Sequence, residues 1–281
     1  LGDVYKRQVK HNAFNLATGD ILVEVDHDDL ISTDCLEELN KAYQDSEIGF
    51  VYSDSLLYDL SGKMKPFDRI YGWEYHMESF RGKEYIRHIG FEPSSHSLSF
   101  IWYSPDHIRS WRKSVYNSIG GHNPTMEVCD DHELLIRTYL NTRLYRIDKC
   151  LYYYRIHPNF ENTQFERNEL IQKTTKELFV KYAQKLAERD AELNNTLKVD
   201  LGGGINPKPG YITIDQTDGN ISCDLNNGIP LEDNSVGVIN ASHFIEHIKD
   251  PPKIMGEIHR VLCDGGWAFI EVPSTDGRGA W

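Results

Sequence analysis

The stretch Ile21-Leu22-Val23-Glu24-Val25-Asp26-His27-Asp28-Asp29 decides the fold of the first part of the chain. It is a short apolar run with β-branched residues that ends in three carboxylates, which is typical of a buried strand. In open α/β sheets, ligands bind at the carboxyl ends of the strands. Because Asp26 and Asp28 are two residues apart, their side chains point the same way in an extended segment. The stretch therefore predicts a strand that presents two carboxylates to a ligand.

Two carboxylates on one side of a strand suit Mg²⁺ or Mn²⁺ carrying a diphosphate, because such a metal usually takes only one or two protein carboxylates. The alternative is an acidic loop or a helix N-terminus. In that case Asp28 or Asp29 caps a helix that begins near Ser32. The nine residues alone leave both interpretations open.

Composition limits the possible classes of protein. The 281 residues are 40% hydrophobic and 26% charged, which is typical of a soluble globular chain with one large domain or two ordinary ones. No apolar stretch is as long as a transmembrane segment, and no signal peptide is visible. The net charge of −13 argues against nucleic-acid binding but not against nucleotide ligands. The five cysteines are scattered without a CxxC pair, which favours reduced thiols and a cytoplasmic location.

Both ends of the chain suggest a fragment. Residue 1 is Leu rather than Met, and residues 1–8 resemble translated adaptor sequence. Residues 276–281 follow a predicted strand with no closing element. We therefore expect residues 1–8 to lie outside the fold and the chain to be cut at both ends.

Periodicity places a helix over residues 9–18, a strand over 21–25, a helix from about 35 to 44 and a strand over 48–52 that ends near Asp54. This alternation predicts an α/β fold with parallel strands. Residues 56–116 are rich in aromatics, which belong either to an acceptor platform or to the core. A polar turn at residues 61–63 suggests a hairpin within this part.

A second acidic motif lies at Asp130-Asp131, at the predicted start of a helix. Carboxylates there are favourable with the helix dipole. The alternative is that one of them is the general base for a sugar hydroxyl. Residues 146–155 then form a predicted strand that leads to His157.

Three motifs in order, ATGDILVEVDHDD (17–29), SIGGHNPTMEVCDDHELLIR (118–137) and LYYYRIHPNFENT (151–163), resemble the inverting family-2 glycosyltransferases of the GT-A fold. The resemblance covers residues 9–163. It implies that Asp26 and Asp28 bind the metal and the diphosphate of a nucleotide-sugar donor. It also implies that Asp131 is the catalytic base beside Asp130, and that His157 lies near the diphosphate. The first strand of that family and its nucleobase-binding segment are expected upstream of residue 9.

Residues 164–195 alternate charges with an apolar residue every fourth position, which predicts one helix of about 25 residues. We expect a linker helix, with a coiled-coil surface as the alternative. After it, VDLGGG (199–204) ends a strand in an Asp-x-Gly-x-Gly turn, which lets backbone pass close to a cofactor. A following strand ends in Asp215, placed to accept hydrogen bonds from a ribose.

VDLGGG, ITID (212–215), CDLNNGIPLEDNSVGVINASHFIEHI (223–248) and EIHRVLCDGGWAFIEVP (257–273) resemble class I S-adenosylmethionine-dependent methyltransferases. The resemblance implies a cofactor site made by the following residues: Asp200, Gly202, Gly204, Asp215 at the ribose, Asp224 near the adenine, and His243. Asn206 and Pro207 depart from the family, where a glycine and a helix start are usual. A metal at His243 and His247 has no third ligand in the sequence.

The sequence therefore predicts an α/β protein with a partial GT-A domain over residues 9–163, a linker helix over 164–195 and a partial Rossmann-like methyltransferase domain over 196–281. Three functions compete. The first is metal-assisted sugar transfer to a hydroxyl of a glycan or other acceptor, in polysaccharide biosynthesis. The second is methyl transfer as the main activity. The third is a non-catalytic remnant.

Overall fold

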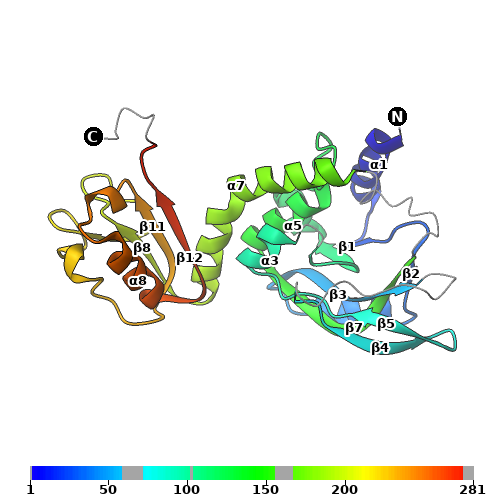
Figure 1. The fold of residues 1–281 in the computed structure, drawn as a ribbon. Helices are drawn as coiled ribbons and strands as arrows, with labels where there is room; N and C mark the ends of the chain where they lie inside the picture. Colours follow the sequence, from blue (N-terminus) through cyan, green and yellow to red (C-terminus); the bar gives the residue numbers. More distant parts are fainter. Residues whose placement is uncertain (1, 59–71, 102–103, 156–166, 275–281) are drawn as a thin grey trace. The chain divides into compact units, whose positions relative to one another are not determined.

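The computed structural model describes residues 2–58, 72–101, 104–155 and 167–274 (Figure 1). The chain forms two compact units, Leu1–Tyr182 and Ala183–Trp281. Each unit is built on a β-sheet with helices, so the predicted α/β class is confirmed. The predicted turn at 61–63 and the predicted site residue His157 lie outside the described residues.

The first unit contains a mixed sheet. Its strand order is β1-β6-β3-β5-β4, and β7 pairs with β3 and β2. The elements in chain order are α1 (Gly2–Leu16), β1 (Ile21–Glu24), β2 (Leu30–Ile31), α2 (Cys35–Ala42), β3 (Ile48–Tyr58), β4 (Tyr75–Phe80), β5 (Lys83–His88), α3 (Ser95–Phe100), β6 (Arg109–Arg112), α4 (Lys113–Ser118), α5 (Asp130–Asn141), β7 (Arg143–Arg155) and the first part of α7 (Asn168–Leu193).

The prediction of parallel strands is only partly right for this sheet. β3 and β7 are parallel, but β6 lies between β1 and β3 and is antiparallel to both. β6 comes from the aromatic-rich part of the chain and carries Trp111, whose side chain is buried against Phe50. Burial of this ring stabilises β6 in the sheet, a strand that the alternation of helices and strands in the sequence does not predict.

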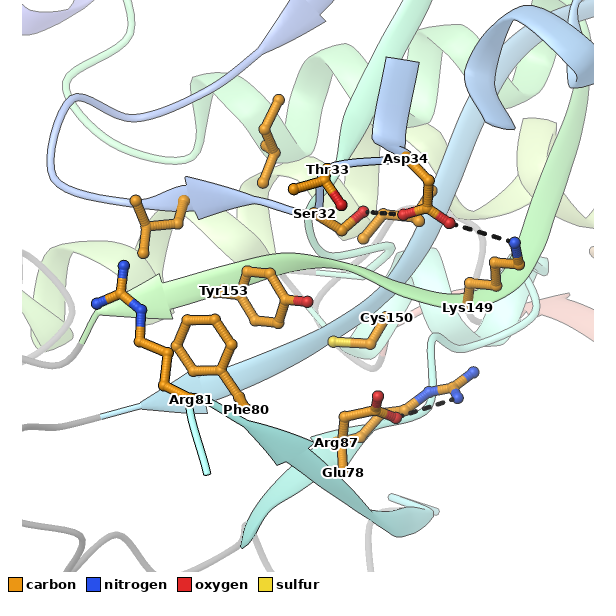
Figure 2. A pocket seen from close by; sticks show the side chains of 13 residues that line it. Ser32, Thr33, Asp34, Glu78, Phe80, Arg81, Arg87, Lys149, Cys150 and Tyr153 are labelled. Atoms are coloured by element: carbon orange, nitrogen blue, oxygen red, sulfur yellow. Dashed lines mark hydrogen bonds and ion pairs between the residues drawn. The ribbon is translucent and has the colours of Figure 1, made fainter. Parts of the chain in front are cut away.

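The aromatic residues predicted to form either a platform or a core mostly form a core. Trp73 and Trp111 are 4% and 1% exposed. Phe80 on β4 instead stacks on Tyr153 of β7, with ring centroids 4.2 Å apart, at the wall of a cleft (Figure 2). The core interpretation therefore holds for the two tryptophans, whereas Phe80 and Tyr153 pack against a smaller apolar cluster and line the cleft.

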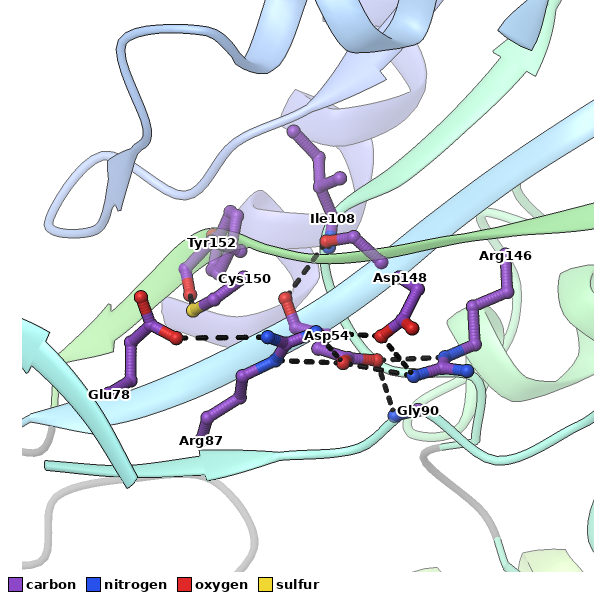
Figure 3. Close-up of polar contacts among 10 residues, drawn as sticks. Asp54, Glu78, Arg87, Gly90, Ile108, Arg146, Asp148, Cys150 and Tyr152 are labelled. Carbon is purple, nitrogen blue, oxygen red and sulfur yellow. Dashed lines mark hydrogen bonds and ion pairs between the residues drawn. The ribbon is translucent and has the colours of Figure 1, made fainter. Parts of the chain in front are cut away.

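Asp54 does not end β3 as predicted, because the strand continues to Tyr58. Its side chain is fully buried and accepts hydrogen bonds from the Arg87 and Arg146 guanidinium groups at 2.6–3.0 Å and from the Gly90 N–H at 2.8 Å (Figure 3). The two arginines supply the countercharge that a buried carboxylate requires. Asp54 is therefore a structural residue that ties β3 to β5 and β7.

The second unit contains a five-stranded parallel sheet of order β10-β9-β8-β11-β12. Its core gathers the apolar side chains of these strands and of one face of α8, including Ile254 and Ile258. The elements are the end of α7, β8 (Leu197–Leu201), β9 (Ile212–Asp215), β10 (Ile221–Ser222), η2 (Leu225–Asn227), β11 (Val236–Ser242), η3 (Ile245–His247), α8 (Pro251–Val261) and β12 (Leu262–Glu271).

The long helix predicted from charge alternation is present as α7, with 26 residues. Three of its predicted apolar positions, Leu178, Tyr182 and Leu186, are buried. The boundary between the two compact units falls within this helix, after Tyr182. In the described ranges, no helix is both long and apolar enough to span a membrane.

His122 is expected to make the first unit sensitive to acid. Burial lowers the pKa of His122 to about 4, against about 6.5 for an unfolded histidine. Between these values the unfolded chain binds a proton that the folded chain does not, so stability falls as pH drops from 6.5 to 4. Replacing His122 with Phe should reduce the difference in unfolding free energy between pH 7.5 and pH 4 by roughly 3 kcal/mol.

Urea denaturation of both proteins at the two pH values measures this difference. Phe is the chosen replacement because the neighbours of His122 include Phe14 and Trp111, with ring centroids at 5.0 and 6.2 Å. If the two proteins lose the same stability on acidification, His122 is not the group that titrates.

Candidate functional site

The three carboxylates after β1 lie in a turn rather than in an extended segment. The Asp29 N–H donates to the Asp26 carbonyl at 3.2 Å, which closes the turn. The alternation of side chains along an extended strand, on which the sequence prediction relied, therefore does not apply to Asp26 and Asp28. The alternative that Asp28 or Asp29 caps a helix is wrong, because α2 begins at Cys35, with Asp34 at its N-cap.

Asp29 explains why the chain turns here. Its carboxylate accepts hydrogen bonds from the Tyr152 hydroxyl at 2.6 Å and from the Arg155 N–H at 2.8 Å. The same Tyr152 hydroxyl accepts the Asp26 N–H at 3.2 Å. These contacts anchor the acidic turn to β7. They leave the Asp26 and Asp28 side chains partly exposed, at 37% and 27%.

The second acidic motif begins α5, as predicted. One Asp131 carboxylate oxygen accepts a hydrogen bond from the Arg109 guanidinium at 2.9 Å, and the other accepts the His132 N–H at 2.8 Å. Arg109 is only 2% exposed and also donates to the Pro105 carbonyl. A buried arginine thus fixes the orientation of the predicted base.

Lys10 of α1 brings the two acidic motifs into one electrostatic cluster. Its ammonium lies 2.5 Å from a Glu24 carboxylate oxygen and 3.7 Å from one of Asp26. Its charge also acts on Asp131. Glu24 pairs with Arg109 across β1 and β6, and Arg109 binds Asp131. A chain of contacts therefore links Asp26 and Asp131, which are 105 positions apart in the sequence.

The balance of burial and charge sets the ionisation of this cluster. Burial raises the pKa of Asp131, but the positive charges of Arg109 and Lys10 outweigh it and hold that pKa below its usual range. Burial and then the charge of Asp131 raise the pKa of Asp130. Burial disfavours charge on Glu24, yet Lys10 and Arg109 keep the pKa of Glu24 well below normal. Asp131 is thus ionised at neutral pH and can accept a proton.

The donor set after β1 fits a hard divalent cation only in part. Carboxylate oxygens are the ligands that Mg²⁺ and Mn²⁺ prefer, and Mg²⁺ is commonly held by one or two carboxylates plus substrate phosphates. In the described part of the chain, no group of three or more His, Cys, Asp or Glu side chains is placed to hold a metal. A metal at Asp26 and Asp28 would therefore depend on oxygens from a bound diphosphate.

Three residues that organise this site could not be identified from the sequence. Lys10 lies in a helix preceding the acidic strand, and Arg109 lies in the unpredicted strand β6. Tyr152 is one of three consecutive tyrosines, Tyr152–Tyr154. A lysine or arginine within reach of a carboxylate cluster leaves no local signal in sequence, because its partner lies far along the chain.

In the second unit, the predicted cofactor residues lie at the carboxyl ends of neighbouring parallel strands. Gly202 and Gly204 follow β8, Asp215 ends β9, and His243 follows β11. The strand order reverses between β8 and β11, which is where open α/β sheets bind ligands. Gly202 has φ +70°, and a Cβ there would lie 2.6 Å from the Phe244 ring. Only glycine fits this turn, because its φ is left-handed and Phe244 fills the space that a Cβ would take.

The carboxylates around that turn have distinct partners. Asp200 is buried and accepts from the Asn240 side chain at 2.7 Å and the Lys208 N–H at 2.9 Å, so it holds the turn in place. Asp215 accepts the Gly204 N–H at 3.2 Å.

Asp224 and His243 complete the predicted set. The Asp224 carboxylate accepts the Asn226 N–H at 3.0 Å and caps η2. His243 has φ +52°, its N–H donates to the Glu271 carbonyl, and its Nδ1 lies 3.4 Å from Glu246.

Comparison with known proteins agrees with the second half of the sequence prediction. Residues 204–270 match the family model described as a methyltransferase domain. No curated protein sequence matches the chain.

Among solved structures, the chain is similar to the crystal structure of S. aureus TarS 1-349, with 17% identity and a TM-score of 0.37 over 53% of this chain and 39% of that chain. It is similar at 18% identity to the same protein in complex with UDP, with a TM-score of 0.36 over 54% of this chain and 40% of that chain. It is also similar at 18% identity to the complex of the same protein with UDP-GlcNAc, with a TM-score of 0.35 over 52% of this chain and 37% of that chain. The aligned part thus spans about two fifths of the TarS chain or less.

The methyltransferase match covers β9, β10 and β11 and reaches into β12, and its first residue, Gly204, lies in the glycine turn after β8. A domain of this family implies S-adenosylmethionine as the methyl donor. Residues 204–270 of the chain thus match a methyltransferase domain, and their strands belong to a parallel Rossmann-like sheet.

Proposed function

We propose that residues 9–163 transfer a sugar from a nucleotide-sugar donor to a hydroxyl of a glycan or other acceptor, with inversion at the anomeric carbon. The observation that carries the proposal is the chain of contacts that links Asp26 to Asp131 through Lys10, Glu24 and Arg109. A diphosphate-binding carboxylate and an ionised base must lie close together for this reaction, because the leaving group and the acceptor flank the same carbon. We place this activity in polysaccharide biosynthesis.

In the proposed reaction, Asp131 takes the proton of the acceptor hydroxyl as that oxygen forms a bond to the anomeric carbon. The bond from this carbon to the diphosphate oxygen breaks, and its electrons leave with the nucleoside diphosphate. Arg109 orients Asp131 and keeps it ionised, while Asp29 and Tyr152 hold the turn that carries Asp26 and Asp28. Mg²⁺ or Mn²⁺ held by Asp26 and Asp28 would neutralise charge on the leaving group. His157 is proposed to lie near the diphosphate.

We propose further that the second unit binds S-adenosylmethionine, the source of an electrophilic methyl group. Gly202 and Gly204 would let the backbone approach the cofactor, and Asp215 would accept hydrogen bonds from its ribose hydroxyls. Asp224 would lie near the adenine and His243 beside the reacting end, with Asp200 supporting the turn. Because the family match lies here, methyl transfer as the main activity is the second candidate function.

Two titrations separate these functions. With Mn²⁺ present, we expect wild-type protein to bind a nucleoside diphosphate, tested with UDP, GDP, ADP and dTDP. We expect Asp28→Ala to weaken that binding at least tenfold and to leave S-adenosylmethionine binding unchanged, because Asp28 and Asp215 lie in different compact units. Asp215→Ala should have the opposite effect. Isothermal titration calorimetry measures both affinities.

Asp34→Ala is the matched control for Asp28→Ala, since Asp34 is a nearby carboxylate that pairs with Lys149 at 3.3 Å rather than with the cluster. Equal losses in the two variants would mean that negative charge in general, not the proposed site, attracts the Mn²⁺ that carries the nucleotide. Binding of neither ligand by wild-type protein would support the third hypothesis, a non-catalytic remnant.

A further inference from the structure

A cleft of about 510 Å³ in the first unit is not used by the proposed reaction. We call it the Tyr153 cleft. Its walls come from the segment after β2, which contributes Ser32, Thr33 and Asp34, from the β4–β5 hairpin and from β7 (Figure 2). Its volume lies in the range typical of small-molecule sites.

The Tyr153 cleft is separate from the Asp26–Asp131 cluster. On β7, the Tyr152 hydroxyl binds Asp29 in the acidic turn, whereas the next residue, Tyr153, lines the cleft. Successive side chains of a strand point to opposite faces of the sheet. A ligand in the cleft would therefore lie on the face of β7 away from the proposed donor site.

The cleft has an aromatic wall with a cation beside it. The rings of Phe80 and Tyr153 stack with an interplanar angle of 18°, and the Arg81 guanidinium carbon lies 5.1 Å from the centroid of the Phe80 ring. Figure 2 shows the two rings side by side with the Arg81 side chain next to them. Phe80 covers one face of the Tyr153 ring, and the exposed remainder of this half-buried ring suits the C–H groups of a sugar. A guanidinium suits a phosphate or carboxylate.

Arg81 differs from the other cations of the cleft. Lys149 pairs with Asp34 and Glu38, and Arg87 pairs with Asp54, Asp148 and Glu78. Within the described ranges, Arg81 forms no ion pair, and its side chain is exposed at the turn of the hairpin. Its charge is thus available to an anionic group, while the hydroxyl of Thr33 can donate to and accept from sugar hydroxyls.

We propose that the Tyr153 cleft binds a sugar unit that carries an anionic group, with its ring against Tyr153 and its charge at Arg81. The anionic group is a phosphate or a carboxylate, and both present oxygens that an arginine binds with two parallel hydrogen bonds. This site adds to the proposed function, because it would hold a charged glycan at a distance from the donor centre.

Saturation-transfer NMR tests this site with glucose 6-phosphate, glucuronate and glucose as probes. We expect at least one charged sugar to bind saturably, and Arg81→Gln to weaken that binding about tenfold or more while leaving glucose unaffected. Tyr153→Ala should weaken all three sugars, and Tyr153→Phe, which keeps the ring, should bind as wild type does. Lys83→Gln is the matched control, because Lys83 lies on the same hairpin outside the cleft.

The preference between the two charged sugars tells whether the cleft selects phosphate or carboxylate. Three results would overturn the proposal: no saturable binding of either charged sugar, equal losses in Arg81→Gln and Lys83→Gln, or displacement of the sugar by UMP with the same dependence on Arg81. Nucleoside diphosphate binding in Arg81→Gln is measured in parallel. Since the two sites are separate, it should be unchanged, and failure of one site is distinguishable from failure of the other.

Discussion

Replacing Asp131 with Asn is expected to lower the turnover of the nucleotide-sugar donor by about a thousandfold, with little change in nucleoside diphosphate affinity. Loss of a positioned general base typically costs between 10² and 10⁴ in rate. Asn keeps the shape of the side chain and can still accept a hydrogen bond from Arg109, but it cannot take the acceptor proton. Release of nucleoside diphosphate under saturating donor measures the rate, and calorimetry measures the affinity.

Asp130→Asn is the matched control, because Asp130 is the neighbouring carboxylate at the same helix start. Its raised pKa leaves it less charged than Asp131, so we expect a rate loss under tenfold.

Arg109→Gln gives a second readout of the same base. Removing the guanidinium raises the pKa of Asp131, so the pH below which activity falls should move upward. A larger loss of rate in Asp130→Asn than in Asp131→Asn would mean that Asp130, not Asp131, is the general base. An unchanged acid limb in Arg109→Gln would contradict the assignment of Asp131.

Replacing Asp54 with Ala is expected to destabilise the first unit by about 3–5 kcal/mol, the usual cost of removing one partner from a buried ion pair. Asp54 is fully buried, and its carboxylate is the shared acceptor of Arg87 and Arg146 (Figure 3). Without it, two guanidinium groups that are only 14% and 19% exposed face each other. Urea denaturation monitored by tryptophan fluorescence measures the loss.

Asp148→Asn is the control for Asp54→Ala. Asp148 contacts the same two arginines at 2.9 and 3.3 Å but is 81% exposed. Solvent screening makes such contacts worth about 0–1 kcal/mol. Asp54→Ala and Asp148→Asn variants of equal stability would show that the arginines are held by other contacts.

Much of the fold follows from local sequence patterns. The apolar run before Asp26, the acidic start of α5 and the parallel strands of the second unit were predictable, because burial of alternating or continuous apolar residues decides such elements locally. The glycine turn after β8 was predictable as well. The turn needs a left-handed backbone at Gly202, and glycine is the residue that adopts this conformation most readily.

The rest depends on partners that lie far along the chain. In the sequence, Asp29 is one of three carboxylates that cannot be told apart. In the structure, hydrogen bonds from Tyr152 and Arg155 make it the residue that anchors the turn. The sequence predicts that a strand ends near Asp54. In the structure the strand continues, because Arg87 and Arg146, distant in sequence, neutralise the buried Asp54 carboxylate. Arg109 lies in a strand that the sequence pattern does not reveal. Buried charges are decided by tertiary contacts, which periodicity does not encode.

The most direct test of the proposed donor centre is Mn²⁺ binding followed by electron paramagnetic resonance, which reports the free ion. Two protein carboxylates alone hold such an ion weakly, and a diphosphate supplies the missing oxygens. We predict weak Mn²⁺ binding by the protein alone, at least tenfold tighter binding once a nucleoside diphosphate is added, and loss of this gain in the Asp26→Asn/Asp28→Asn double variant. Mn²⁺ binding that is indifferent to the nucleotide, or that survives in the double variant, would contradict the proposed role of these two residues.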